Sequence, residues 1–297
     1  MQQHTLKDWI IATRPWSFPI SSMPVIVTCA YLVWQARPLN WTEAFLALIG
    51  MVVFHAAGNV LSDLWDYRKG VDNEQAYAVP NLVFKYFAPN EYKWLSIFLF
   101  AVGIAIGVCL CFMAGWQLLI IGGVGFALAA SYSFFKYRAL GDVFVFTCFS
   151  VLPMIGTSFV TTGEIFPGTL WVAFPLGMIT VAVLHNNNTV DIATDKASGI
   201  KTIPIALGER TSAALYIVYL MLPYLGVLLA CIMGALPWLS LLCLLSAPVA
   251  CKNCMTASRY FKEGRQALLG LDQKTAQLHM AFSLLLSLGL VAAHFLC

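Results

Sequence analysis

The sequence predicts an all-α integral membrane protein with about nine transmembrane helices in a single bundle. Hydrophobic residues make up 60% of the 297 residues and charged residues only 10%, whereas soluble domains carry about 25% charged residues. The apolar runs reach about 20 residues, the length of a membrane-spanning helix, and are too long for barrel strands. A net charge of +3 with scattered basic residues excludes a nucleic-acid-binding protein, and 13% aromatic residues exclude a disordered one.

Nine apolar segments are predicted to cross the membrane, and together they form one domain, residues 1–297. The first follows Lys7 and Arg14 without a small-residue cleavage site, so we expect an uncleaved helix. The seventh and eighth are separated only by Ala235 and Pro237, which leaves a count of eight open. The predicted spans are 17–35, 43–61, 94–114, 116–134, 143–162, 169–188, 213–234, 236–252 and 278–296.

Basic residues indicate the orientation of these spans. Sixteen of the 17 Lys and Arg residues lie in the N-terminal segment or after spans two, four, six and eight, and only Arg37 lies on the other side. Because Lys and Arg are enriched in cytoplasmic loops, we expect a cytoplasmic N-terminus and an external C-terminus. The nine cysteines form no recognisable disulfide framework, and Cys251 and Cys254 are a lone CxxC pair without partners for a zinc site.

A first group of carboxylates follows the second span. Asn59, Asp63 and Asp66 have the spacing i, i+4 and i+7, which places them on one face of a helix. Gly70 is expected to end this helix and to let Asp72 turn back towards the same place. Acidic residues at membrane depth are costly and usually functional, so their presence here favours a functional site over ordinary loop charge.

A second group follows the sixth span. Asn187, Asp191 and Asp195 have the spacing i, i+4 and i+8, again one stripe of a helix. Like charges at this spacing repel each other, so the arrangement favours a bound cation. The ligands are all oxygen atoms, which suits magnesium better than zinc.

Two such groups on one membrane face predict a diphosphate site. Magnesium held by one or two carboxylates takes further ligands from water and phosphate. Lys69, Lys136, Arg138 and Lys201 are predicted on the same face, where their charges would neutralise a diphosphate. The alternative is that both groups are solvated helix ends, which is less economical for two matching stripes.

The sequence resembles the UbiA superfamily of intramembrane prenyltransferases, and within it the 1,4-dihydroxy-2-naphthoate polyprenyltransferases of the menaquinone branch. The resemblance implies a helical bundle with a central cavity open to the cytoplasmic side. Ser62 and Val190 depart from the family pattern, which usually has Asn and Arg there, and Lys85 is the only basic residue of the loop 73–91. The matching segments are Thr13–Pro19 with Pro24 and Val25, Asn59–Asp72, Phe135–Asp142, His185–Thr202, and Leu207 with Gly208.

The resemblance implies magnesium-dependent transfer of a polyprenyl group from its diphosphate to an aromatic acceptor. For dihydroxynaphthoate the products are demethylmenaquinone, carbon dioxide and diphosphate. The expected metal ligands and catalytic residues are Asp63, Asp66, Asp191 and Asp195. The expected substrate-binding residues are Asn59, Lys69, Asp72, Tyr132, Lys136, Asn187 and Lys201.

Some roles and functions stay open at this stage. His185 is interpreted as a hydrogen-bonded structural residue rather than an acceptor contact, and Arg14 as either an acceptor contact or an interfacial anchor. An acceptor of the 4-hydroxybenzoate or homogentisate type is the alternative within the enzyme class. A cation-coupled transporter and an inactive binding relative are the alternatives from other classes. The expected location is the inner membrane of a bacterium, with the active-site loops in the cytoplasm.

Overall fold

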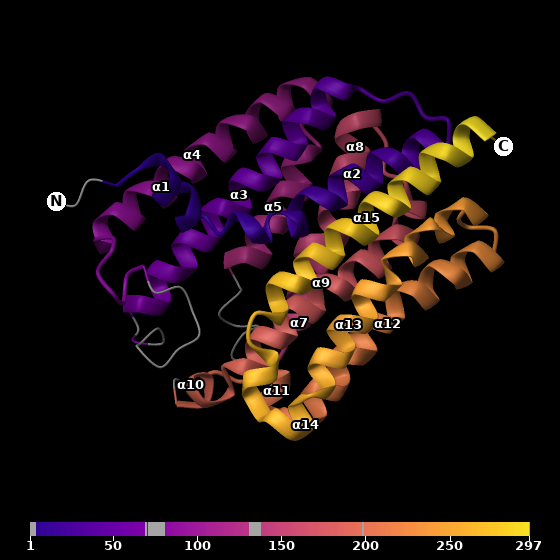
Figure 1. Cartoon of the computed structure of the whole chain (residues 1–297). Coiled ribbons are helices and arrows are strands. Elements are labelled where there is room, and N and C mark those ends of the chain that lie inside the picture. Colours follow the sequence, from indigo (N-terminus) through magenta and orange to yellow (C-terminus); the bar gives the residue numbers. More distant parts are fainter. Residues whose placement is uncertain (1–3, 69, 71–80, 131–137, 198, 297) are drawn as a thin grey trace.

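A computed structural model describes residues 4–68, 70, 81–130, 138–197 and 199–296, and all regular structure in these ranges is helical (Figure 1). Eight helical segments are long and apolar enough to cross a membrane, which confirms the predicted all-helical membrane fold. These segments are Pro15–Trp34, Trp41–Arg68, Pro89–Ala114, Gly141–Thr162, Pro167–Val190, Glu209–Ile232, Trp238–Leu268 and Leu271–Leu296.

Each of these eight segments coincides with one of the nine predicted spans. The remaining predicted span, 116–134, contains helix α5 (Leu118–Ala130), and its residues 131–134 lie outside the described ranges. The seventh and eighth spans are separate, because α12 (Glu209–Ile232) ends before a turn and a new helix begins at Trp238. The eight candidate spans among the described residues therefore do not come from a merger of these two.

The first half of the chain supplies one side of the bundle (Figure 1). A short helix, α1 (Leu6–Ala12), is capped by Thr5 and joins α2 (Pro19–Trp34) through the 3-10 turn η1 (Pro15–Ser17). Helices α3 (Trp41–Arg68) and α4 (Pro89–Ala114) pack along each other, and α5 follows. The fifth span consists of α7 (Gly141–Phe146), the wider turn η2 (Thr147–Val151) and α8 (Leu152–Thr162).

The second half packs around the last helix. The 3-10 turn η3 (Pro167–Thr169) leads into α9 (Leu170–Val190), followed by α10 (Ile192–Ala197), α11 (Ile203–Leu207) and α12. The eighth span combines η4 (Trp238–Ser246), α13 (Ala247–Ser258), α14 (Tyr260–Glu263) and η5 (Gly264–Leu268). Helix α15 (Leu271–Leu296) then packs against α2, α9 and η4, and links the two halves.

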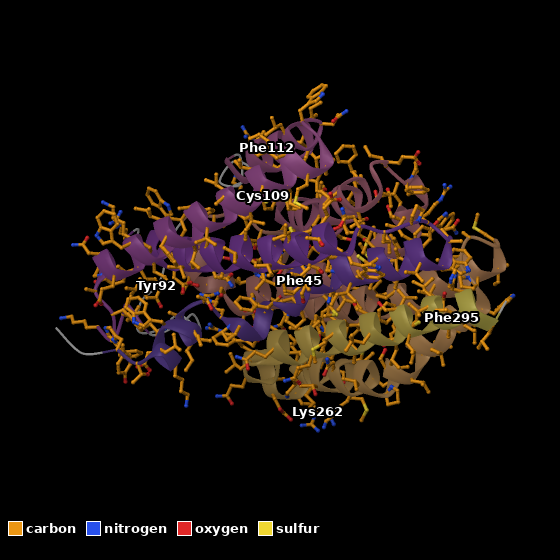
Figure 2. The ribbon with its side chains drawn as sticks, turned by 90° about the horizontal axis from the view of Figure 1, so that it is seen from above. Phe45, Tyr92, Cys109, Phe112, Lys262 and Phe295 are labelled. Carbon is orange, nitrogen blue, oxygen red and sulfur yellow. The ribbon has the colours of Figure 1, made fainter. Side chains whose placement is uncertain are left out.

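The packing of α15 depends on a glycine. A Cβ atom at Gly289 would lie 2.1 Å from the carbonyl oxygen of Leu239, so only glycine allows the two backbones to approach this closely. Leu278, Phe282 and Leu286 of the same helix are completely buried. By contrast, Phe112 at the end of α4 and Phe295 near the C-terminus are 86% and 75% exposed and point outward (Figure 2). Apolar side chains facing outward suit a protein surrounded by lipid.

The C-terminal end of α3 lies at one end of the bundle, together with α1, α10, α11 and α14 (Figure 1). The Ala139 N–H donates a hydrogen bond to the Lys201 carbonyl, which joins the connection before α7 to the one before α11. At the opposite end, the Arg37 guanidinium lies 4.5 Å from the ring centre of Phe166. Among the described residues, the elements expected on the basic side therefore lie together.

Candidate functional site

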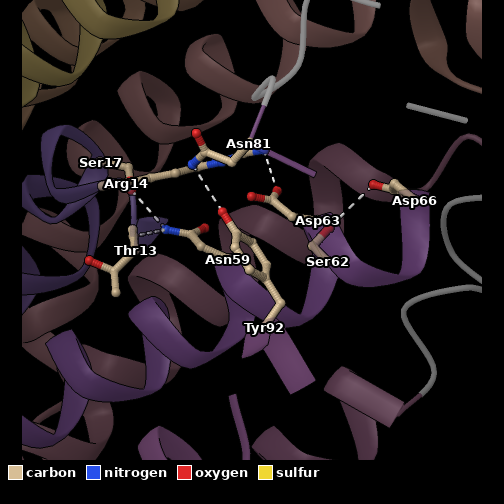
Figure 3. Close-up of polar contacts among 9 residues, drawn as sticks. All are labelled: Thr13, Arg14, Ser17, Asn59, Ser62, Asp63, Asp66, Asn81 and Tyr92. Carbon is tan, nitrogen blue, oxygen red and sulfur yellow. Dashed lines mark hydrogen bonds and ion pairs between the residues drawn. The ribbon is translucent and has the colours of Figure 1, made fainter. Parts of the chain in front are cut away.

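The first carboxylate group lies on a single continuous helix. Asn59, Asp63 and Asp66 all belong to α3, which ends at Arg68, and Gly70 follows with a φ of 70°. This backbone conformation suits glycine and confirms the expected end of the helix. The amide nitrogen of Asn59 donates to the Thr13 carbonyl at 3.0 Å and to Ser17 Oγ at 3.1 Å, so η1 fixes its orientation (Figure 3).

Arg14 forms an ion pair with Asp63 (Figure 3). Arg14 has a left-handed backbone with a φ of 57°, just before η1, and its guanidinium reaches the buried carboxylate, which is 4% exposed. Burial of a carboxylate is costly unless a cation or hydrogen-bond donors accompany it, and Arg14 supplies both. Sequence reasoning assigned Arg14 to the acceptor or to the membrane interface, whereas the structure places it on the first aspartate motif.

Asp66 lies one turn beyond, at the edge of the site. Its side chain is partly exposed, and Ser62 Oγ donates a hydrogen bond to Asp66 Oδ2 at 3.4 Å (Figure 3). Ser62 stands where the family pattern usually has Asn. In the structure its hydroxyl donates to one of the motif carboxylates.

The second carboxylate group crosses a break between two helices. Helix α9 ends at Val190 and α10 begins at Ile192, so Asp191 lies at the junction and Asp195 lies on the next helix. The prediction of one continuous helical stripe was wrong in this respect, although the Asp191 N–H still donates to the Asn187 carbonyl at 2.9 Å. Asp195 is buried, and the Asn187 side-chain oxygen is buried without a hydrogen-bond partner among the described residues.

Arg265 is a site residue that sequence reasoning missed. It belongs to η5, and its guanidinium lies 3.7 Å from Asp191 Oδ1. The two side chains are 38% and 26% exposed, so a solvated ligand can reach them. Arg265 lies near the end of the eighth span, far from either motif in the sequence, and no spacing rule joins it to them. Only the general placement of basic residues on this face pointed towards it.

His185 has a structural role, as the sequence favoured. The ring is completely buried, Nε2 lies 3.1 Å from the Ser212 carbonyl oxygen, and Nδ1 lies 3.5 Å from Asp142 Oδ2. The Tyr219 hydroxyl donates to the same carboxylate at 3.4 Å. These contacts tie α9 to α7 and α12 and leave the ring no exposed surface for a substrate.

The predicted cation and aromatic positions are only partly described. Lys201 is exposed beside α11, close to the connection that contains Ala139. Lys69, Asp72, Tyr132 and Lys136 lie outside the described residues. Their predicted roles in substrate binding therefore stay predictions.

The donor atoms of the two motifs fit magnesium better than a metal whose ligands all come from protein side chains. Among the residues that the structure describes, no three His, Cys, Asp or Glu side chains form a group that would hold a metal ion. Magnesium is commonly held by one or two carboxylates together with water and substrate phosphates. The two carboxylates of each motif and the unpartnered oxygen of Asn187 provide such a partial ligand set.

Comparison with known proteins identifies the family. The model of the UbiA prenyltransferase family matches residues 22–269, most of the chain. The chain belongs to the UbiA prenyltransferase family. It is 30% identical to UbiA prenyltransferase domain-containing protein 1 of Mus musculus, with 98% of this chain and 86% of the relative covered. It is also 30% identical to the Homo sapiens protein of that name, with 96% and 84% covered.

Solved structures of UbiA homologues share the fold. The homologue from Aeropyrum pernix K1 aligns with a TM-score of 0.64 at 16% identity, over 92% of this chain and 97% of the other. The homologue from Archaeoglobus fulgidus bound to GPP and Mg2+ aligns with a TM-score of 0.55 at 15% identity, over 96% and 99%. This UbiA-family chain is thus an integral membrane enzyme of the prenyltransferase class.

Proposed function

We propose that the enzyme transfers a polyprenyl group from polyprenyl diphosphate to an aromatic acceptor in a magnesium-dependent reaction. The acceptor proposed is 1,4-dihydroxy-2-naphthoate, which would lose carbon dioxide and give the hydroquinone form of demethylmenaquinone. One observation carries the proposal: the two aspartate motifs stand at the same end of the bundle, and each has an arginine partner, Arg14 or Arg265. A UbiA homologue bound to GPP and Mg2+ shares this fold.

In this proposal, four aspartates hold magnesium: Asp63, Asp66, Asp191 and Asp195. Magnesium, when bound, stabilises the charge that develops on the leaving diphosphate. The amide of Asn59 is fixed by its two hydrogen bonds, which leave its oxygen for a ligand, and Asn187 offers its unpartnered oxygen. Asp72 would support the first motif.

Basic residues of the same face would hold the diphosphate itself. Lys69, Lys136 and Lys201 have this role in the proposal. Their positive charges would neutralise the part of the diphosphate charge that magnesium does not. A charge stabilised in a site sheltered from water lowers the barrier to breaking the allylic C–O bond.

The membrane serves the reaction in two ways. A long apolar tail can enter laterally from the lipid between helices, and the enclosing helices exclude water from the allylic cation, which water would quench. Tyr132, one turn before Lys136, is proposed to stabilise this cation through the face of its ring. We also propose, from the distribution of basic residues, that the N-terminus and the loops carrying the motifs face the cytoplasm. We propose the inner membrane of a bacterium as the location.

The test is incubation of purified enzyme with magnesium, geranyl diphosphate and a panel of aromatic acids labelled with carbon-14 in the carboxyl group. The proposal expects prenylated product and labelled carbon dioxide with dihydroxynaphthoate. Product with 4-hydroxybenzoate or homogentisate alone would retain prenyl transfer and reject the naphthoate assignment. No product with any acceptor would contradict the proposed prenyl transfer and favour an inactive relative that only binds its ligands. Cation-dependent uptake of a solute into vesicles that contain the protein would favour a transporter.

A further inference from the structure

The polar stripe of α3 continues one turn deeper than Asn59, at His55. The ring of His55, on α3, lies among residues of two other spans: Ser17 and Ser21 belong to the first span, and Phe149 belongs to η2 of the fifth. The Phe149 and Phe18 ring centres lie 5.1 and 6.0 Å from the imidazole centre. His55 is partly exposed where these spans meet, which leaves part of the ring open to a small molecule.

The hydrogen bonds fix which nitrogen of His55 carries the proton. Ser21 Oγ donates its only hydrogen to the Phe18 carbonyl at 3.1 Å, so towards His55 it can only accept. It lies 3.0 Å from Nδ1, which must therefore donate. In the neutral ring one nitrogen donates and the other accepts, so Nε2 holds the free lone pair.

Nε2 has no good donor among the described residues. Its neighbour is Ser17 Oγ at 3.5 Å, but that hydroxyl donates to the Arg14 carbonyl at 2.8 Å. Ser17 Oγ also accepts a hydrogen bond from the amide of Asn59 at 3.1 Å. A lone pair held in place inside a membrane protein without a matching donor is a position for a ligand hydroxyl.

We propose that His55 Nε2 accepts a hydrogen bond from a ring hydroxyl of the aromatic acceptor and takes its proton during prenyl transfer. This rests on the proposed function. His55 precedes Asp63 by two helical turns, about 12 Å at a rise of about 1.5 Å per residue. That separation leaves room for the allylic carbon of a metal-bound diphosphate and for the acceptor ring. The rings of Phe18 and Phe149 provide apolar edges for an aromatic molecule.

The proton is returned at the end of the reaction. As the O–H proton moves to Nε2, the O–H electron pair conjugates into the ring, and a ring carbon uses its π electrons to bond the allylic carbon. The allylic C–O pair leaves with the diphosphate. The carboxylate on the substituted carbon then departs as carbon dioxide, its bonding pair restores the aromatic ring, and the imidazolium returns the proton to the ring oxygen. General-base contributions of this kind are about 100-fold to 10,000-fold in rate.

The test combines a change in the enzyme with a change in the acceptor. For wild-type enzyme, His55→Leu and His55→Gln, kcat/KM is measured with the free hydroxyl acceptor and with its methyl ethers, which have no proton to donate. Wild type should prefer the free acceptor by about 100-fold, and both variants should lose most of that preference. KM for geranyl diphosphate should change less than about twofold, which also shows that the variants fold. His294→Leu, at an exposed position, is the matched control and should behave as wild type.

Two outcomes would overturn the inference. Variants with full wild-type rates would do so, and so would variants that are slower but keep the full preference for the free hydroxyl. If wild-type enzyme transfers the prenyl group to no phenolic acceptor, the proposed function fails, but the contact with His55 can still be tested. The measurement is then binding of the acceptor, followed by the acceptor's fluorescence. The contact is supported if His55→Leu binds the free hydroxyl acceptor more weakly than wild type does but binds the methyl ether equally well. It is rejected if the two proteins bind the free hydroxyl acceptor with equal affinity.

Discussion

Arginine partners are what the structure adds to the aspartate motifs. Arg14 meets Asp63 from the segment before the first long helix, and Arg265 meets Asp191 from η5, at the end of the eighth span. These guanidinium groups offset part of the negative charge of the two motifs. A guanidinium group can also bind phosphate oxygens through two parallel hydrogen bonds. In the proposed function, each motif therefore combines carboxylates for a metal with a cation for the diphosphate.

Removal of a motif carboxylate tests the metal assignment. Asp66→Ala or Asp191→Ala should lower kcat at least about 100-fold. The variant would lose a proposed ligand of the magnesium that stabilises the leaving diphosphate. Thermal unfolding in detergent should stay close to wild type, since both side chains are partly exposed. Glu263→Ala, an exposed carboxylate of α14, is the control and should keep full activity. Near-normal turnover by either motif variant would reject the assignment.

Arg265→Gln tests the second arginine. The loss of one cation beside Asp191 should raise KM for prenyl diphosphate about 10-fold, with a smaller change in KM for the acceptor, because we propose that Arg265 binds the phosphate end. Arg265→Lys should recover part of the affinity. Arg259→Gln changes an exposed arginine a few residues earlier and should leave both KM values unchanged. Equal effects of the two glutamine variants would show that only general surface charge matters.

Helices were predicted well from hydropathy, and their interruptions were not. Apolar runs of about 20 residues identify membrane spans because lipid requires all backbone groups to be paired. The break at Asp191 depends on how α10 turns away from α9, and the spacing of Asn187, Asp191 and Asp195 carries no sign of it. The contact of Arg265 with Asp191 likewise arises from tertiary packing, which no local pattern encodes.

Gly289 tests the packing of α15 against η4. Gly289→Ala places a methyl group against the Leu239 carbonyl, and a backbone cannot yield as a side chain can. We expect destabilisation of about 1–3 kcal/mol, the usual range for overpacking, seen as a lower midpoint of thermal unfolding in detergent. Leu288→Ala, at a neighbouring side chain that is 58% exposed, is the control. A midpoint lowered no more by Gly289→Ala than by the control would contradict the close approach.

For the whole molecule, charge and fold agree on a two-ended bundle. The basic residues predicted one end, and α1, α10, α11 and α14 lie there together with the end of α3, which carries the first aspartate motif. Composition predicted an integral membrane protein, and motif spacing predicted which carboxylates belong to the site. The arrangement of Arg14, Arg265 and His55 around them required coordinates, because these residues come from different spans.

The orientation can be tested with introduced cysteines. Lys262→Cys lies at the motif end and Glu164→Cys at the opposite end, and both positions are exposed. In sealed vesicles with the cytoplasmic face inward, a membrane-impermeant maleimide should label Glu164→Cys and spare Lys262→Cys, with unaltered protein as the background. Inverted vesicles should give the reverse pattern. The opposite result would place the motifs outside the cytoplasm.

The most direct test of the central claim is the binding of prenyl diphosphate to purified enzyme with and without magnesium. We predict tight binding of geranyl diphosphate that requires magnesium and falls at least about 10-fold in both Asp66→Asn and Asp191→Asn, because the diphosphate is bridged between the two motifs. Binding that is equally tight after chelation of magnesium, or that needs only one of the two motifs, would contradict the account.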